Sequence, residues 1–300
     1  MDVAGNLRLG VVGLSDGNGH PYSWSAIFNG YDPAAMEACG YPVIPRYLER
    51  QSWPEAAIPG ARVTHVWTQS PELSRNIAKA ARIAIIADRL EDMLDAVDGI
   101  LLARDDAETH FEMARPFLEA GLPVYIDKPV ALSLADLDRL YALERYPGQI
   151  FTCSALAYAS ELKLSAADAA SIGRLRHIVG SVPKDWERYA VHVIEPLVKL
   201  LNEQGEIVAT QAWRHGEMAS LNVAWEGGAQ ATVTTFGSAP APLSLRVCGE
   251  RGWKDLFFTD TFAAFKAALE DFVAGIRARD VRSDRRIVRR VVDLIERGRA

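Results

Sequence analysis

The first half of the chain alternates short apolar runs with segments in which apolar residues recur at helical spacing. Buried strands are expected at 7–14, 62–67, 83–86, 98–102 and 123–126. Helices are expected from Pro21 onward and at 71–82, 107–120 and 133–143. This alternation with short connections predicts a parallel sheet with helices on both faces. Residues 32–61, rich in proline and aromatic side chains, fit neither pattern, and no element is predicted there.

The pattern changes after Gln149, where strands follow one another along the chain. Strands are expected at 150–154, 176–181, 208–213, 219–225, 230–236 and 243–248, and helices at 189–201, 261–277 and 283–297. Such a segment is typical of an α+β domain with an open, mainly antiparallel sheet. The predicted fold class is therefore α/β, with a parallel N-terminal sheet followed by this α+β domain. We place the two domains at 1–149 and 150–300.

The net charge of the chain argues against nucleic acid as a partner. The chain carries a formal charge of −6 and has a pI of about 5.6, so nucleic acid is not expected as a partner. Basic residues do gather between Arg277 and Arg290, but Asp280 and Asp284 lie among them. This mixture favours a solvated helix face over a phosphate-binding patch.

Cysteine usage and hydropathy indicate the compartment. Cys39, Cys153 and Cys248 are far apart and show no C-x-x-C spacing, which argues against a disulfide framework and a zinc site. We therefore expect no metal centre. No signal peptide is evident, and no apolar stretch approaches the ~20 residues of a membrane span. The expectation is a cytoplasmic protein with no membrane partner.

A glycine-rich turn follows the first predicted strand. It contains Gly13, Leu14, Ser15, Gly17, Asn18, Gly19 and His20. In a dinucleotide-binding fold, glycines here allow the backbone to approach a pyrophosphate, and the helix that follows favours its negative charge. The full G-x-G-x-x-G pattern is absent, so an ordinary turn between strand and helix remains the alternative.

The end of the second predicted strand bears on the choice of cofactor. NAD-binding folds often place an acid there to bind the ribose hydroxyls. Here Gln69 and Ser70 stand at that point, and Arg75 follows. An uncharged strand end beside an arginine would tolerate the 2′-phosphate of NADP, so either NAD or NADP is expected. The alternative for Arg75 is a surface position on its helix.

The segment Val124-Tyr-Ile-Asp127-Lys128-Pro129 ends the fifth predicted strand with a lysine. The sequence here resembles the Gfo/Idh/MocA oxidoreductases, whose fifth strand typically ends Glu-Lys-Pro. Similar runs cover 98–110, 117–124 and 264–277. The resemblance implies an N-terminal Rossmann domain that binds NAD or NADP. It also implies cofactor contacts from Ala103, Arg104, His110, Asp127 and Lys128.

A second motif in the resemblance lies in the C-terminal half. The family typically carries Asp-x-x-x-His at a helix start, and His192 matches the histidine, while Arg188 replaces the aspartate. Residues four apart share a helix face, so arginine there would instead bind a substrate carboxylate or phosphate. Trp186 and Tyr189 are expected to contact substrate as well. The alternative for His192 is a packed helix histidine.

The activity implied by the resemblance is hydride transfer between a nicotinamide cofactor and a hydroxyl or keto carbon of a sugar, sugar acid or nucleotide sugar. Lys128 and His192 are the expected catalytic residues. A homodimer or homotetramer is expected through the second domain's sheet, on the apolar positions Val223, Trp225, Val233 and Phe236. Two alternatives stay open: a non-catalytic NAD(P)-binding regulator, and a lyase or glycosidase that uses bound NAD transiently.

Overall fold

The computed structural model describes residues 5–299, which form two compact units. The first unit contains the chain up to Val130 together with Asp138–Thr152 and Phe265–Ser283. The second contains Ala131–Leu137, Cys153–Ala264 and the chain from Asp284 onward. Residues 265–283 thus return to the first unit, although they lie beyond the expected division. The boundary at 149/150 stays a prediction.

Parallel strands form the sheet of the first unit. They are β1 (Leu7–Val12), β2 (Ala61–Trp67), β3 (Ile85–Ile86), β4 (Gly99–Leu102), β5 (Val124–Ile126) and β6 (Ile150–Phe151), in the order β3-β2-β1-β4-β5-β6. Leu9, Val11 and Ile100 are fully buried, as expected for a parallel sheet that is covered on both faces. The order is that of a dinucleotide-binding Rossmann sheet, so the predicted N-terminal fold is confirmed.

Helices connect these strands. They are α1 (His20–Asn29), α4 (Pro71–Ala80), α5 (His110–Glu119) and α6 (Leu134–Tyr141), with 3₁₀ turns η1 (Leu90–Met93) and η2 (Ala107–Thr109). Their ends carry ordinary local signals: Ser70 caps α4, and Gly121, with a φ of 86°, follows α5. The unassigned segment 32–61 forms α2 (Pro33–Glu37), capped by Asp32, and α3 (Val43–Leu48).

Aromatic packing shows which helices cover the sheet near β5. Tyr125 stacks on Trp24 of α1 at 4.6 Å between ring centroids. The same ring contacts Phe272 of α10 (Thr261–Ala278) at 5.7 Å. Because both partners touch one side chain, α1 and this part of α10 cover the same face of β5.

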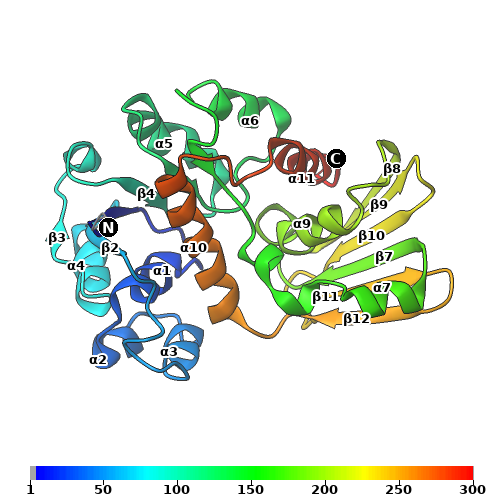
Figure 1. Cartoon of the computed structure of the whole chain (residues 1–300), viewed down its shortest axis with the longest axis horizontal. Helices are drawn as coiled ribbons and strands as arrows, with labels where there is room; N and C mark the ends of the chain where they lie inside the picture. Colours follow the sequence, from blue (N-terminus) through cyan, green and yellow to red (C-terminus); the bar gives the residue numbers. More distant parts are fainter. Residues whose placement is uncertain (1–4, 300) are drawn as a thin grey trace. The chain divides into compact units, whose positions relative to one another are not determined.

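The second unit is built on a mixed open sheet. Its strands are β7 (Leu175–Val182), β8 (Ile207–His215), β9 (Met218–Trp225), β10 (Gln230–Thr235), β11 (Ser244–Gly249) and β12 (Trp253–Phe257), in the order β12-β11-β7-β10-β9-β8. All neighbours are antiparallel except β7 and β10, so the predicted sheet type is confirmed. The helices of this unit are α7 (Ala166–Ile172), α8 (Trp186–Tyr189), α9 (Val191–Leu200) and α11 (Arg285–Arg297), and α9 lies over the sheet with α11 beside it (Figure 1).

The two faces of this second sheet differ from expectation. Val223, Trp225 and Val233 were expected to make both faces apolar, but all three are buried on the face that α9 covers. The opposite face carries hydroxyl and amide side chains in its centre, where Thr232 donates to Asn222 at 2.8 Å. Exposed aromatic rings lie on its outer strands, namely Trp213, Trp253 and Phe257. The apolar motive for oligomerisation is therefore corrected for these three residues, whereas Phe236, just after β10, is partly exposed. The exposed apolar side chains on the open face include the edge aromatics and Val179 of β7.

Candidate functional site

The carboxyl ends of β1, β4 and β5 bring three loops of the first unit to one edge of its sheet. These loops are the turn 13–19, the segment 103–109 and the pair Asp127–Lys128. In open α/β sheets this edge is where ligands bind. The predicted cofactor residues on these loops therefore lie in one neighbourhood, and their side chains are joined by hydrogen bonds.

The glycine turn is shaped by close contact with Arg104. Gly13 has a φ of 79°, and a Cβ there would lie 2.5 Å from Cδ of Arg104, so only glycine fits. The carbonyl of Leu14 accepts hydrogen bonds from Gln69 Nε2 and Arg104 Nη1. Gly17, at the exposed tip with a φ of 77°, has open space where a side chain would begin. The turn is thus held at its base and open at its tip.

Ser15 connects the turn to Lys128 through a buried carboxylate. Its hydroxyl donates to Asp105 Oδ1 at 2.6 Å and accepts from the backbone N–H of Asp105 at 3.1 Å. The Lys128 ammonium donates to the other oxygen, Oδ2, at 3.3 Å. Lys128 and Asp105 are each 4% exposed. A buried charge requires such a partner, so Asp105 fixes where the ammonium points.

The Asp127 carboxylate also binds side chains of the glycine turn and of the start of α1. Its Oδ2 accepts from Asn18 at 2.8 Å and lies 2.5 Å from Nδ1 of His20. Asn18 in turn accepts from the backbone N–H of His20 at 2.9 Å. The His20 ring stacks on Trp24 with centroids 4.8 Å apart. The first turn of α1 is therefore tied to the residue that precedes Lys128.

His110 joins the loops after β4 and β5 from beneath. It is fully buried, with Nδ1 at 3.0 Å from the carbonyl of Val130 and Nε2 at 2.9 Å from that of Arg104. Both ring nitrogens thus face backbone oxygens, which gives the side chain a shaping role in the loops. Ala103 is also fully buried, and its N–H donates to Val12.

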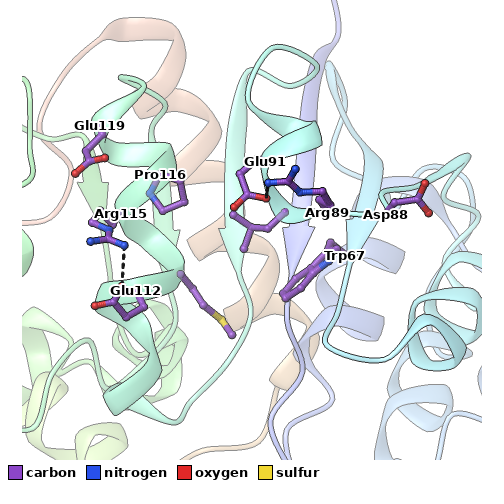
Figure 2. Close-up of a pocket in the computed structure, with 10 residues that line it drawn as sticks. Trp67, Asp88, Arg89, Glu91, Glu112, Arg115, Pro116 and Glu119 are labelled. Atoms are coloured by element: carbon purple, nitrogen blue, oxygen red, sulfur yellow. Dashed lines mark ion pairs between the residues drawn. The ribbon is translucent and has the colours of Figure 1, made fainter.

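Beyond β2 the predicted cofactor residues lie at the start of α4. Ser70 caps that helix, Gln69 holds the glycine turn, and Arg75 is exposed on the helix surface. Trp67, the last residue of β2, lines a groove of about 540 Å³ with residues of η1 and α5 (Figure 2). Its rim holds the ion pairs Glu112–Arg115 at 3.0 Å and Arg89–Glu91 at 3.3 Å. Asp88 and Glu119 add two further acids, so the groove has a negative rim.

A dinucleotide fits the shape of this edge. The positive φ values and the open tip at Gly17 suit a close approach of phosphate to backbone, and Arg104 lies beside the turn. Among residues 5–299, no group of three or more His, Cys, Asp or Glu side chains could hold a metal ion. No helix in that described range is long and apolar enough to cross a membrane.

The predicted substrate residues lie on α8 and α9 of the second unit. His192 is 8% exposed, and its Nδ1 lies 2.9 Å from Oγ of Ser154. Ser154 is fixed in turn, because its N–H donates to Glu195 at 2.6 Å. The Tyr189 ring meets the His192 ring edge-on, with centroids 5.4 Å apart. These contacts hold the imidazole in one orientation.

Arg188 and Trp186 differ in exposure although they share one helical turn. Arg188 is partly exposed, and its backbone N–H donates to the side chain of Asp185, which caps the helix. Trp186 is 1% exposed, and its indole N–H donates to the carbonyl of Ile295 at 2.9 Å. Trp186 therefore anchors α11, which leaves it a packing role rather than a substrate contact.

Four partner residues were absent from the sequence prediction: Asp105, Asp106, Ser154 and Glu195. Asp105 and Asp106 follow a buried strand as adjacent acids, which is a usable signal for the ligand edge of a parallel sheet. Glu195 lies three residues after His192, a spacing that puts both on one helix face. Ser154 carries no comparable signal, because its role depends on tertiary contact alone.

Comparisons with known proteins bear on this edge directly. Residues 39–154 match the model of the Gfo/Idh/MocA oxidoreductase family with an NAD-binding Rossmann fold. This match covers less than half of the chain and shows that residues 39–154 are similar to the NAD-binding domain of that family. YceM of Salmonella typhimurium, whose name assigns it to the oxidoreductases, is 27% identical over 52% of this chain and 48% of its own length. The chain thus spans about half or less of the curated relatives it matches.

Solved structures resemble the whole chain. UDP-N-acetylglucosamine 3-dehydrogenase GnnA from Acidithiobacillus ferrooxidans has a TM-score of 0.71 at 17% identity, with 98% of this chain and 97% of that chain covered. Myo-inositol 2-dehydrogenase from Lactobacillus plantarum has a TM-score of 0.73 at 15% identity, with coverages of 97% and 95%. At such identities these two likenesses show a shared fold.

Proposed function

We propose that this protein is a Gfo/Idh/MocA-type, NAD(P)-dependent dehydrogenase or reductase that acts on a hydroxyl or keto carbon of a sugar, sugar acid or nucleotide sugar. The observation that carries the proposal is Lys128, a buried ammonium that donates to Asp105 beside the glycine turn, where Ser15 bonds the other oxygen of that carboxylate. The family relation supports the reaction type, and the sugar-related names of the structural neighbours support the substrate class.

When bound, the nicotinamide ring exchanges the hydride. In this proposal Lys128 donates a hydrogen bond to the reacting substrate oxygen and favours its developing negative charge. His192 exchanges the proton of the same hydroxyl as general base or acid, a role that suits imidazole near neutral pH. Arg188 and Tyr189 orient the substrate. The proposal requires Lys128 and His192 to reach one substrate oxygen.

We infer that the cofactor's diphosphate lies on the turn 13–19 and that its adenosine end lies near Trp67 at the end of β2. The acids around that groove supply no positive charge for a 2′-phosphate, which favours NAD over NADP. Arg89 and Arg115 on the rim are each paired with an acid, and Arg75, exposed on α4, is the predicted ligand for a 2′-phosphate. Thermal shifts with each cofactor test this choice, because a ligand that binds the native state raises apparent stability. A larger shift with NADP that Arg75→Ala removes would reverse it.

Absorbance at 340 nm with each cofactor and a panel of sugars, sugar acids and nucleotide sugars separates the candidate functions. Net cofactor turnover supports the dehydrogenase. Saturable cofactor binding without turnover supports the non-catalytic regulator. Product formation without net change in reduced cofactor supports a lyase or glycosidase. Absence of binding by either cofactor at millimolar concentration would reject all three.

We also propose a homodimer or homotetramer that pairs the open faces of the second unit's sheet. The exposed rings of Trp213, Trp253 and Phe257 support this, because aromatic side chains are enriched at interfaces. Light scattering at micromolar concentration checks it, and a monomer mass would reject it. Trp253→Ser should then shift the mass toward the monomer. We propose a cytoplasmic location, because Cys39, Cys153 and Cys248 form no disulfide bond.

A further inference from the structure

The cations at the glycine turn are already neutralised by carboxylates of the same unit. Lys128 pairs with Asp105, Arg104 with Asp106, and the His20 ring faces Asp127. Asp16 adds another acid on the turn itself. Lys128 and Arg104 are thus each paired with an acid, and four carboxylates lie on the loops where a doubly charged diphosphate is expected to bind. By Coulomb's law these carboxylates oppose the attraction that the helix start and the turn backbone offer a diphosphate, so a change of pairing that turns a cation toward the ligand would strengthen binding.

Tyr41 lies within reach of two of these carboxylates. Its ring lies against the turn, since a Cβ at Gly19 would be 2.8 Å from Tyr41 Cγ. Burial raises the pKa of Tyr41, and the nearby charges of Asp16 and Asp105 raise it further. Both carboxylates thus act on a group that touches the start of α1, where the diphosphate would lie.

Arg104 is the cation best placed to change partners. Its side chain crosses the turn against Gly13, and it donates through Nε to Asp106 Oδ1 at 2.8 Å and through Nη2 to the other oxygen. This two-pronged contact has the geometry by which arginine also binds phosphate. The Arg104 and Asp106 side chains are 11% and 12% exposed, so the pair is reachable by a ligand while little screened by water.

We propose that Asp106 binds the Arg104 guanidinium in the free protein. When the dinucleotide binds, its diphosphate takes the place of the Asp106 carboxylate on that guanidinium. Asp106 is then an affinity-setting residue: it keeps the arginine positioned in the free protein and must be displaced when the cofactor enters. The identity of the ligand rests on the proposed function, whereas the exchange of partners rests on the contacts of Arg104.

Calorimetric titration with NAD and with ADP tests the exchange without any substrate. Asp106→Asn should tighten binding of both by about tenfold, because the competing charge is gone while the amide oxygen can still position Arg104. Arg104→Gln should weaken binding by about tenfold or more. The double variant should bind no more tightly than Arg104→Gln, because the gain from removing Asp106 acts through the arginine.

Glu108→Gln is the matched control. Glu108 is an exposed acid in the same loop, and its replacement removes the same charge. Binding by this variant should stay within about twofold of wild type, since exposed charges are screened by solvent and salt. Equal tightening by Glu108→Gln and Asp106→Asn would show a general field effect and overturn the exchange.

The remaining outcomes separate the inference from the proposed function. Wild-type binding that Asp106→Asn leaves unchanged or weakens overturns the exchange alone. Absence of binding by wild type and all variants removes both proposals, whereas binding gained only in Asp106→Asn supports the exchange. Thermal melts confirm that each variant is folded, and Asp106→Ser replaces Asp106→Asn if the amide variant does not fold.

Discussion

Lys128 in the first unit and His192 in the second are both buried polar groups, but their partners differ in kind. The Lys128 ammonium lies on the carboxylate of Asp105, an acceptor that suits only a donor. The His192 ring lies on the hydroxyl of Ser154, which can donate or accept. Glu195 affects the His192 ring only through Ser154, because its carboxylate accepts a hydrogen bond from the backbone N–H of Ser154.

This difference suits the two proposed roles. A group that stabilises negative charge throughout a reaction benefits from one fixed charge state, and Asp105 supplies the counter-charge for it. A group that gains and loses a proton benefits from a partner that tolerates both states, and Ser154 can reverse its hydrogen bond. The contrast therefore predicts that Lys128 is coupled to the stability of its unit more strongly than His192 is.

The largest expected effect is on catalysis. Lys128→Ala and His192→Asn should each reduce turnover by about 10²–10⁴-fold, and His192→Asn should leave cofactor affinity near the wild-type value. Steady-state kinetics with the substrate found in the panel, together with NAD titration, check this. If His192→Asn lowers the melting temperature but the folded protein keeps its turnover, then His192 only packs its helix and the contrast in roles is lost.

Much of the fold beneath this contrast is predictable from sequence. Apolar runs such as that from Leu7 to Val12 identify parallel strands that are buried on both faces, and Ser70 before Pro71 signals a helix start. By contrast, α2 and α3 contain only five and six residues, too few for helical periodicity to show. The strand β12 alternates weakly and received no prediction.

The sequence indicates candidate site residues but not the partners that position them. The strand–lysine–proline segment and the glycine turn can be found because each is a local pattern. Asp105 and Lys128 are 23 positions apart, and Ser154 and His192 are 38 apart. Such pairs form only when the topology brings the loops or helices together. For the same reason the sequence could not distinguish a buried Trp186 from a substrate-facing one.

A stability comparison sharpens the contrast between partners. Asp105→Ala should destabilise the protein by about 3–5 kcal/mol, because it leaves the Lys128 ammonium buried without its carboxylate. Ser154→Ala should cost about 1 kcal/mol, the value of an ordinary hydrogen bond. Urea unfolding of both variants gives the difference directly. Equal losses would mean that the two partners are energetically alike, against the argument above.

A kinetic comparison separates binding from chemistry around His192. Arg188→Ala should raise KM by about tenfold and leave kcat nearly unchanged if the guanidinium binds a substrate anion in ground and transition states alike. Arg214→Ala is a suitable control, because Arg214 is a partly exposed arginine of the same unit and is paired with Glu187. Similar changes in both variants would remove the specific role of Arg188, and a fall in kcat alone would assign it to the chemical step.

An exposed ion pair in the first unit is expected to contribute least to the free energy of unfolding among the pairs compared. Arg8 donates to Asp98 at 2.9 Å with half of its side chain exposed, and this hydrogen bond, with the attraction between the charges, lowers the pKa of Asp98. Since the folded pKa lies below the unfolded one, the stabilisation is present above the unfolded pKa and is lost as pH falls through the folded pKa. Asp98→Asn should therefore cost only about 0.5 kcal/mol near pH 7, because solvent screens the pair. Urea midpoints of wild type and variant should converge as the pH is lowered through the folded pKa of Asp98. A gap that persists below that pKa would show that the Asp98 hydrogen bonds, rather than its charge, supply the stabilisation.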